Sequence, residues 1–161
     1  KPMRKARIMA LKVVVTAHYA ADPDAVFQSA LRFSEMADAM RGIATYSGLP
    51  ASDTAREGER ITVDVTFWGL FTQRGHVMFI ERLDPQARII QSRESGNGIS
   101  RWDHTLSVQP DGSRACWTDT VIIDAGWRTW FIARFAAFIY TRRHRHRNAA
   151  SLTCRISTVS G

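Results

Sequence analysis

Apolar and polar positions alternate most regularly over residues 99–124, where two alternating runs flank the sequence Pro110-Asp111-Gly112-Ser113. Strict alternation is typical of a half-buried β-strand, and Asp-Gly between two such runs favours a hairpin. A loop centred on Asp111 and Gly112 predicts which residues lie directly opposite each other. The predicted pairs are His104 with Asp119, Trp102 with Val121, and Leu106 with Trp117. The face that they share is apolar except for one histidine and one aspartate.

The rest of the chain predicts a strand, two short helices, more strands and a long terminal helix. β-Branched residues favour a strand over Val13–Tyr19. Asp22 and Pro23 suit the start of a helix that continues to about Phe33, and a second short helix reaches Met40. Alternation predicts further strands at 43–47, 60–68, 72–83 and 88–95. After Gly126 the apolar spacing becomes helical, and this helix reaches about Asn148.

These elements predict a single α+β domain over residues 1–161. Tight turns make neighbouring strands antiparallel, and the terminal helix is the element long enough to cover one face of the sheet. We expect a curved antiparallel sheet of about seven strands that grips the long C-terminal helix, with two short helices after the first strand. Residues 1–7 are predicted to be a loose N-terminus and residues 149–161 a loose tail.

Composition and charge narrow the class of protein. A hydrophobic fraction of 45% favours a folded core over disorder. The two cysteines, Cys116 and Cys154, make no disulfide framework, which favours reduced thiols and a cytoplasmic location. The net charge of +7 permits contact with nucleic acid, anionic lipid or acidic ligands. The sequence has no zinc-type Cys/His spacing, phosphate-binding glycine loop or dinucleotide fingerprint, so no metal and no cofactor is expected.

His104 and Asp119 are the candidate catalytic residues. An inward carboxylate would orient the imidazole and raise its basicity, which suits a general base that removes a proton next to a carbonyl. The alternative is a buried polar pair that satisfies itself and fixes the strand register. His76, on an earlier strand, is expected to be hydrogen-bonded within the protein and inert rather than functional.

Aromatic side chains on the hairpin and the terminal helix are the candidate ligand-binding residues. They could offer flat apolar surface to a ligand in a cavity, or they could simply pack the core. Arg134 interrupts the apolar face of the helix, and it could bind a carboxylate or phosphate or could extend to water. The predicted ligand-binding residues are Trp102, His104, Trp117, Trp127, Phe131, Arg134, Phe135 and Phe138.

Positive charge is concentrated near the end of the terminal helix. Arg142, Arg143, Arg145 and Arg147 could contact an anionic membrane surface, whereas nucleic acid is the less expected partner. The alternative is a solvated helix end, where positive charge complements the helix dipole.

Three segments carry a resemblance to a known family. Arg101–Val108, RWDHTLSV, is similar to the tryptophan–histidine strand of bacterial cyclase/dehydrase-like proteins. Thr118–Val121 is similar to their following strand, and Thr141–Arg147 to the basic end of their last helix. Together with the predicted order of elements, residues from about Val13 to Leu152 resemble the START-like (SRPBCC) helix-grip superfamily, in its polyketide cyclase/dehydrase-like branch. This chain departs from many relatives at two places, with Asn97-Gly98-Ile99 after Gly96 instead of Pro-Phe, and with Leu106 instead of a second histidine.

The resemblance implies an elongated apolar cavity between the sheet and the terminal helix. We therefore expect the protein to bind a small hydrophobic ligand there, such as a lipid, a polyketide or an aromatic compound. The first alternative is a cyclase or dehydratase of polyketide-like substrates, with His104 as base, Asp119 orienting it and Arg134 anchoring an oxyanion or carboxylate. The second is a peripheral contact with anionic lipid or nucleic acid through the basic helix end.

Overall fold

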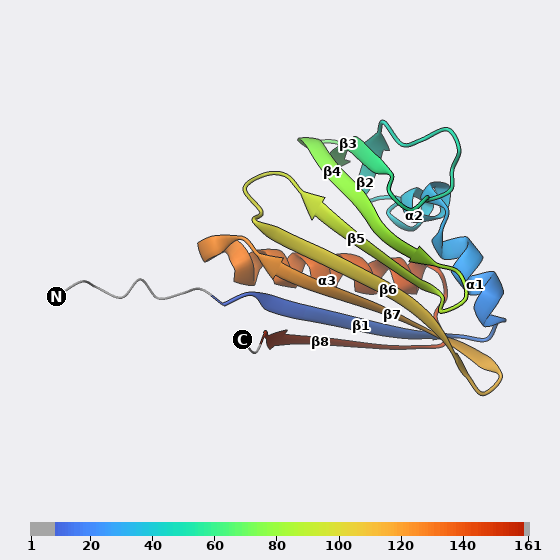
Figure 1. Cartoon of the computed structure of the whole chain (residues 1–161). Coiled ribbons are helices and arrows are strands. Elements are labelled where there is room, and N and C mark those ends of the chain that lie inside the picture. The colour runs from blue at the N-terminus through green and yellow to red at the C-terminus, as the bar shows by residue number, and fades with distance from the viewer. Residues whose placement is uncertain (1–8, 160–161) are drawn as a thin grey trace.

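An eight-stranded antiparallel sheet curves around one long helix in the computed structural model, which describes residues 9–159 (Figure 1). The elements are β1 (Leu11–Tyr19), α1 (Pro23–Ala30), α2 (Phe33–Ala39), β2 (Ala44–Ser47), β3 (Arg60–Phe67), β4 (Phe71–Asp84), β5 (Ile89–Ser95), β6 (Arg101–Asp111), β7 (Arg114–Asp124), the 3-10 turn η1 (Gly126–Arg128), α3 (Thr129–His146) and β8 (Ser151–Thr158). The strand order is β2-β3-β4-β5-β6-β7-β1-β8. The predicted α+β class, with a curved sheet gripping a C-terminal helix, is confirmed.

The eighth strand corrects the prediction of a loose tail at 149–161. Residues Ser151–Thr158 form β8, which pairs antiparallel with β1 from Leu11 opposite Thr158 to His18 opposite Ser151. Most β8 side chains are exposed, so the segment lacks the apolar alternation that marks a half-buried strand. It forms because the backbone groups of β1 would otherwise lie unpaired at the sheet edge. The predicted loose N-terminus at 1–7 lies outside the described residues.

The hairpin of β6 and β7 has a different register from the predicted one. Asp111 pairs with Arg114, which leaves Gly112 and Ser113 as a two-residue turn, and Gly112 has φ +59°. Glycine is favoured at the first central position of such turns because L side chains resist positive φ. The turn shifts the predicted pairing by two residues, so that His104 lies opposite Val121 and not Asp119. A shift of two keeps every side chain on its predicted face.

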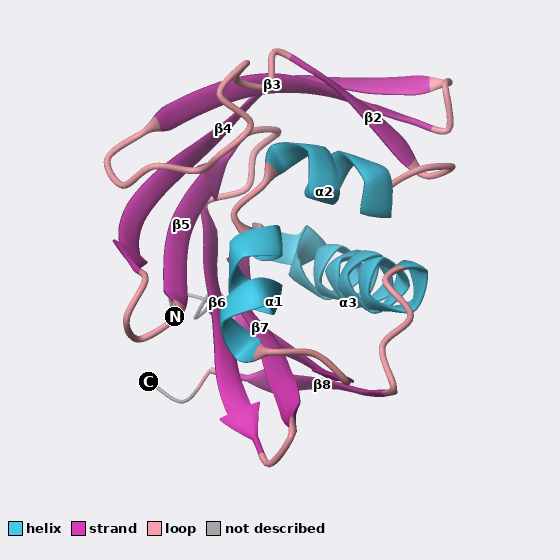
Figure 2. Cartoon of the chain, turned by 90° about the vertical axis from the view of Figure 1, so that its right-hand side faces the viewer, coloured by secondary structure: helices cyan, strands magenta, loops and turns pink. Residues whose placement is uncertain are grey.

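Small side chains determine where α3 lies on the sheet. Ala133, Ala136 and Ala137 are buried and pack in one core cluster with Val13 of β1 and Val121 of β7. Because alanine lets a helix approach a strand closely, α3 is seated on the β1–β7 side of the sheet. Figure 2 views α3 nearly along its axis, with β3 to β6 curving away from it and α1 and α2 beside it. A second core cluster packs residues of α1 and α2 against apolar side chains of strands β2 to β6.

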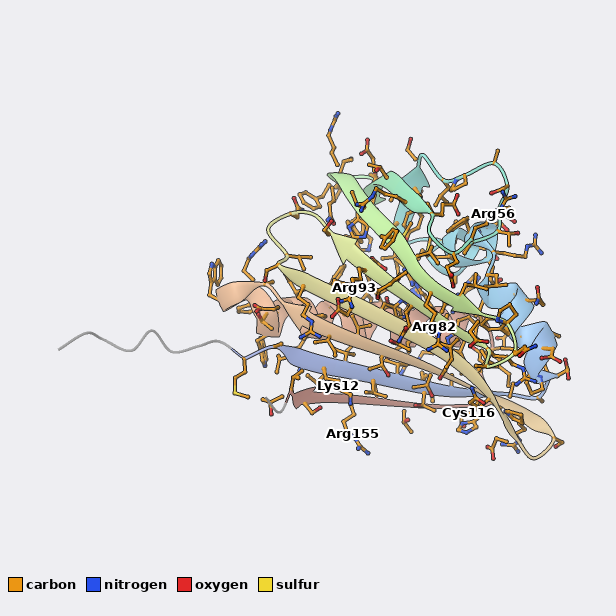
Figure 3. All side chains as sticks on the ribbon, in the orientation of Figure 1. Lys12, Arg56, Arg82, Arg93, Cys116 and Arg155 are labelled. Atoms are coloured by element: carbon orange, nitrogen blue, oxygen red, sulfur yellow. The ribbon has the colours of Figure 1, made fainter. Side chains whose placement is uncertain are left out.

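The outer face of the sheet is polar. Lys12 of β1, Arg93 of β5 and Arg155 of β8 are exposed there, on the side turned away from α3 (Figure 3). Arg93 forms ion pairs with Glu81 (3.0 Å) and Asp103 (2.7 Å). A cavity for an apolar ligand can therefore form only on the inner face of the sheet, which faces α3. Within residues 9–159, no helix is both long enough and apolar enough to span a bilayer.

Candidate functional site: a cavity between the sheet and the long helix

A cavity of about 520 Å³ lies between α3 and strands β3 to β6, away from the β1–β7 side on which α3 packs. This volume is within the range of small-molecule sites, about 300–1,000 Å³. Its apolar lining comes from three regions: α1–α2, strands β3 to β7, and the face of α3 that carries Ile132, Phe135 and Ile139. The cavity exists because the alanines hold α3 close to β1 and β7, while β3 to β5 curve away.

The cavity opens between the tip of the β3–β4 hairpin and the first turns of α3. Trp68 and Phe71 line it although they are 56% and 58% exposed, which places them at its mouth. The rings of Trp68 and Phe135 approach edge-on, with centroids 6.4 Å apart, so the hairpin tip contacts α3 here. A ligand would enter the cavity past Trp68 and Phe71.

Asp119 of β7 lies at the centre of a buried hydrogen-bond network. His104 Nε2 donates to its Oδ1 and His144 Nε2 to its Oδ2, both at 2.8 Å. His144, on α3, is fully buried, and its Nδ1 lies 2.6 Å from the Tyr19 hydroxyl. The predicted pair of His104 and Asp119 is therefore present, joined diagonally and not directly across the strands. The network connects β1, β6, β7 and α3.

The two histidines that share Asp119 differ in what they leave free. Both ring nitrogens of His144 are occupied, so His144 is a structural residue. The Nδ1 atom of His104 has no hydrogen-bond partner among residues 9–159, and His104 lines the cavity. Because Nε2 donates to a carboxylate, Nδ1 of a neutral His104 imidazole carries the lone pair. His104 can thus accept a proton from a molecule in the cavity.

The carboxylates at the site are held ionised. Burial opposes ionisation of Asp119, but the hydrogen bonds and charges of His104 and His144 outweigh it, and its pKa is well below the ordinary 3.8. Burial likewise opposes ionisation of Glu94, but the hydrogen bond from His76 brings its pKa below the ordinary value. Burial raises the pKa of Tyr140 well above 10, so its hydroxyl stays neutral. The cavity therefore presents fixed carboxylates and neutral hydroxyls at neutral pH.

A second histidine–carboxylate pair lines the cavity closer to its mouth. His76 Nε2 of β4 lies 2.7 Å from Glu94 Oε2 of β5, and its Nδ1 lies 3.4 Å from Gln73 Nε2. Both side chains of the pair are about 15% exposed. His76 is hydrogen-bonded on both ring nitrogens, as expected, and its inert role stays a prediction.

The sequence did not indicate a place in the site for five residues: Tyr19, Glu94, Tyr140, His144 and Arg143, the last of which was expected at a membrane surface instead. The three on α3 belong to the face of Ile132, Phe135 and Ile139, continued at spacings of three and four residues. This helical spacing indicates that the three residues face the cavity, but the charges of residues 142–147 favoured a solvated helix end instead. Tyr19 and Glu94 carry no comparable pattern in the sequence.

The structure brings together only part of the predicted ligand-binding set. Trp102, His104, Trp117 and Phe135 line the cavity. The expectation that the other four also line it is wrong: they are Trp127, Phe131, Arg134 and Phe138. Trp127 is 74% exposed and Phe131 61%, and Arg134 stacks over Trp130 at the surface. Large aromatic side chains were expected to face the sheet, but the alanines of α3 occupy that face.

The basic helix end is divided between the cavity and the surface. Arg143 and Arg147 line the cavity, and Arg147 forms an ion pair with Glu35 and stacks over the Trp117 ring at 4.6 Å. Arg142 and Arg145 instead line a shallow groove between α3 and β8. A contact with an anionic membrane at this end would depend on Arg142 and Arg145, and it stays a prediction.

This combination of a curved antiparallel sheet, a gripped C-terminal helix and an intervening cavity is the helix-grip fold. Solved structures with the same fold include protein Ms6760 from Mycobacterium smegmatis (TM-score 0.66, 10% identity, covering 84% of this chain and 86% of that one). Norcoclaurine synthase from Thalictrum flavum (TM-score 0.60, 13% identity, 86% and 95%) and Ara h 8.0201 (TM-score 0.61, 9% identity, 84% and 97%) are also similar. No protein-family model matches the sequence, and no curated protein matches it. At these identities the likeness shows the fold alone.

Proposed function

We propose that this protein binds one small hydrophobic molecule in the cavity between the sheet and α3. The observation that carries the proposal is a cavity of about 520 Å³ whose lining is apolar except for a few convergent polar side chains. Such a lining provides affinity through apolar burial and orientation through a few hydrogen bonds. The fold shared with the similar structures is compatible with this role.

Titration calorimetry with linear primary alcohols, from hexanol to dodecanol, tests the proposal. We expect saturable binding of one alcohol per chain, with a negative heat-capacity change. Each added methylene should increase the affinity about fourfold, since burial of one CH₂ contributes about 0.8 kcal/mol, until the alkyl chain outgrows the cavity. Affinity that does not depend on chain length, or no saturable binding at all, would contradict the proposal.

A second candidate function is acid–base catalysis on the bound molecule, and the free Nδ1 of His104 favours it. Nδ1 would accept a proton from the carbon next to a ligand carbonyl, so that the C–H bond breaks and the electron pair moves onto the carbonyl oxygen. The Tyr140 hydroxyl could stabilise that oxygen, because the His104 and Tyr140 rings lie 5.1 Å apart. The resemblance of Arg101–Val108 to bacterial cyclase/dehydrase-like proteins supports this candidate, and one similar structure is a synthase by name.

Hydrogen exchange into a bound ketone tests His104 as a base. In D₂O, the wild-type protein should speed deuterium incorporation next to the carbonyl of 2-decanone by about 100-fold or more, as measured by NMR. His104→Gln keeps a donor for Asp119 but removes Nδ1, so it should reduce exchange to the background rate with little change in melting temperature. His76→Gln is the matched control and should leave exchange unchanged. Equal exchange with wild type and His104→Gln would exclude His104 as the base.

A further inference from the structure

Arg143 is a cation in the cavity wall that forms no ion pair with any described carboxylate. Its Nη2 donates to the Tyr46 hydroxyl at 3.3 Å, which is a long hydrogen bond. Its Nε is buried without a partner among residues 9–159. The next cavity arginine along the helix, Arg147, does have a carboxylate partner in Glu35. Arg143 is thus half-buried, lacks a carboxylate partner among the described residues, and has a buried Nε without an acceptor.

The carboxylates nearby are engaged elsewhere. Asp119 accepts hydrogen bonds from His104 and His144, and Glu94 from His76. Burial lowers the pKa of Arg143, but the surrounding tyrosines and these two carboxylates outweigh that effect, so the guanidinium stays protonated. The negative charges of Asp119 and Glu94 favour the protonated guanidinium, but neither carboxylate accepts a hydrogen bond from it. A buried N–H without an acceptor is costly, and a ligand acceptor at Nε would remove that cost.

The position of Arg143 relates it to the base candidate. The guanidinium carbon lies 5.0 Å from the centre of the Tyr140 ring, and the His104 ring lies 5.1 Å from the same ring. Both groups therefore lie beside the Tyr140 ring, and the Tyr140 hydroxyl has no protein partner in the described part of the chain. A ligand group at Arg143 would also lie near the hydroxyls of Tyr46 and Tyr140. The apolar lining of Ile139 and Phe135 continues along α3 towards the mouth.

We propose that the cavity selects an amphipathic monoanion, an apolar molecule with one carboxylate, and that Arg143 binds that carboxylate. The proposal rests on the ligand-binding function proposed above and adds the chemical class of the ligand. A carboxylate would accept charge-assisted hydrogen bonds from the guanidinium and further bonds from the Tyr46 and Tyr140 hydroxyls. The apolar body would occupy the remainder of the cavity.

Binding of decanoate and decanol, which share one alkyl chain, tests this selection by calorimetry at pH 7.5. Wild-type protein should bind decanoate at least 10-fold more tightly than decanol. Arg143→Met keeps the apolar stem but removes the charge, so it should lose this preference while decanol binding changes less than threefold. Arg145→Met, the matched control on the exposed side of α3, should keep the preference. The unliganded Arg143→Met protein should remain folded, as measured by circular dichroism.

The outcomes separate this proposal from the ligand-binding function on which it rests. Decanol binding without a preference for decanoate in the wild type would overturn the monoanion proposal and leave hydrophobic binding intact. A preference that persists in Arg143→Met would overturn the role of Arg143. Failure of both probes to bind would overturn both proposals.

Discussion

Replacement of Asp119 by alanine is expected to lower the free energy of unfolding by about 3–5 kcal/mol, because it leaves the buried His144 and the half-buried His104 without their shared acceptor. His144 is fully buried, so its Nε2 cannot find water instead. For a chain of this size, we expect a fall in melting temperature of roughly 10 °C or more. Circular dichroism during thermal and urea unfolding measures both quantities.

The matched control is Asp103→Ala on the neighbouring strand. Asp103 pairs with Arg93 and Arg101 on the outer face of the sheet, where its removal should change stability by less than about 1 kcal/mol. Equal effects of the two substitutions would contradict the structural role of the Asp119 network.

Acid should reveal the same network. The pKa of Asp119 is lower in the folded protein than in the unfolded chain, so the unfolded chain takes up the proton first as pH falls. The stabilisation is therefore complete at neutral pH and declines as pH drops below about 5. Asp119→Ala should show a smaller loss of stability between about pH 5 and pH 2, although Glu94 keeps part of the dependence.

Filling the cavity should strongly weaken ligand binding without unfolding the protein. Ser92 is buried on β5, lines the cavity and lies opposite His104 of β6. A phenyl ring in Ser92→Phe takes the space of three or four methylenes, so decanol affinity should fall roughly 100-fold at about 0.8 kcal/mol per methylene. The cavity accommodates the ring, and overpacking should cost at most about 1–3 kcal/mol of stability.

Two further variants make the cavity-filling result specific. Gln91→Phe adds the same ring to the adjacent position, which points to the opposite face, and should leave decanol affinity unchanged. Ile139→Phe fills the cavity from α3 and should weaken binding as Ser92→Phe does. If the folded Ser92→Phe and Ile139→Phe proteins bind decanol as the wild type does, the ligand site lies elsewhere.

Local patterns were sufficient to predict most of the fold. Alternation identified β3, β6 and β7, and Asp22 caps α1 as expected, with its carboxylate accepting from Ala25 N at 3.0 Å. Two features depended on interactions that the sequence does not display. The strand β8 forms by pairing with the edge of β1, and the β6–β7 register depends on which residues occupy the turn.

The site was predictable only where it depends on strand alternation. His104, Asp119, Trp102 and Trp117 face inward because a strand has two faces and the apolar one must be covered. Apolar side chains lie on most sides of α3, so side-chain size alone does not predict which of them are buried. The small residues Ala133, Ala136 and Ala137 decide the contact face, which directs Arg143 inward and leaves Trp127 and Phe131 outside.

Because α3 covers the sheet without filling the space beneath it, a crystal structure of the protein grown with decanol should show the alcohol in that space. We expect density for the alkyl chain between α3 and strands β3 to β6, in contact with Trp102 and Phe135, with α3 still packed on β1 and β7. A closed, fully packed interior with decanol absent or bound only at the surface would contradict this expectation.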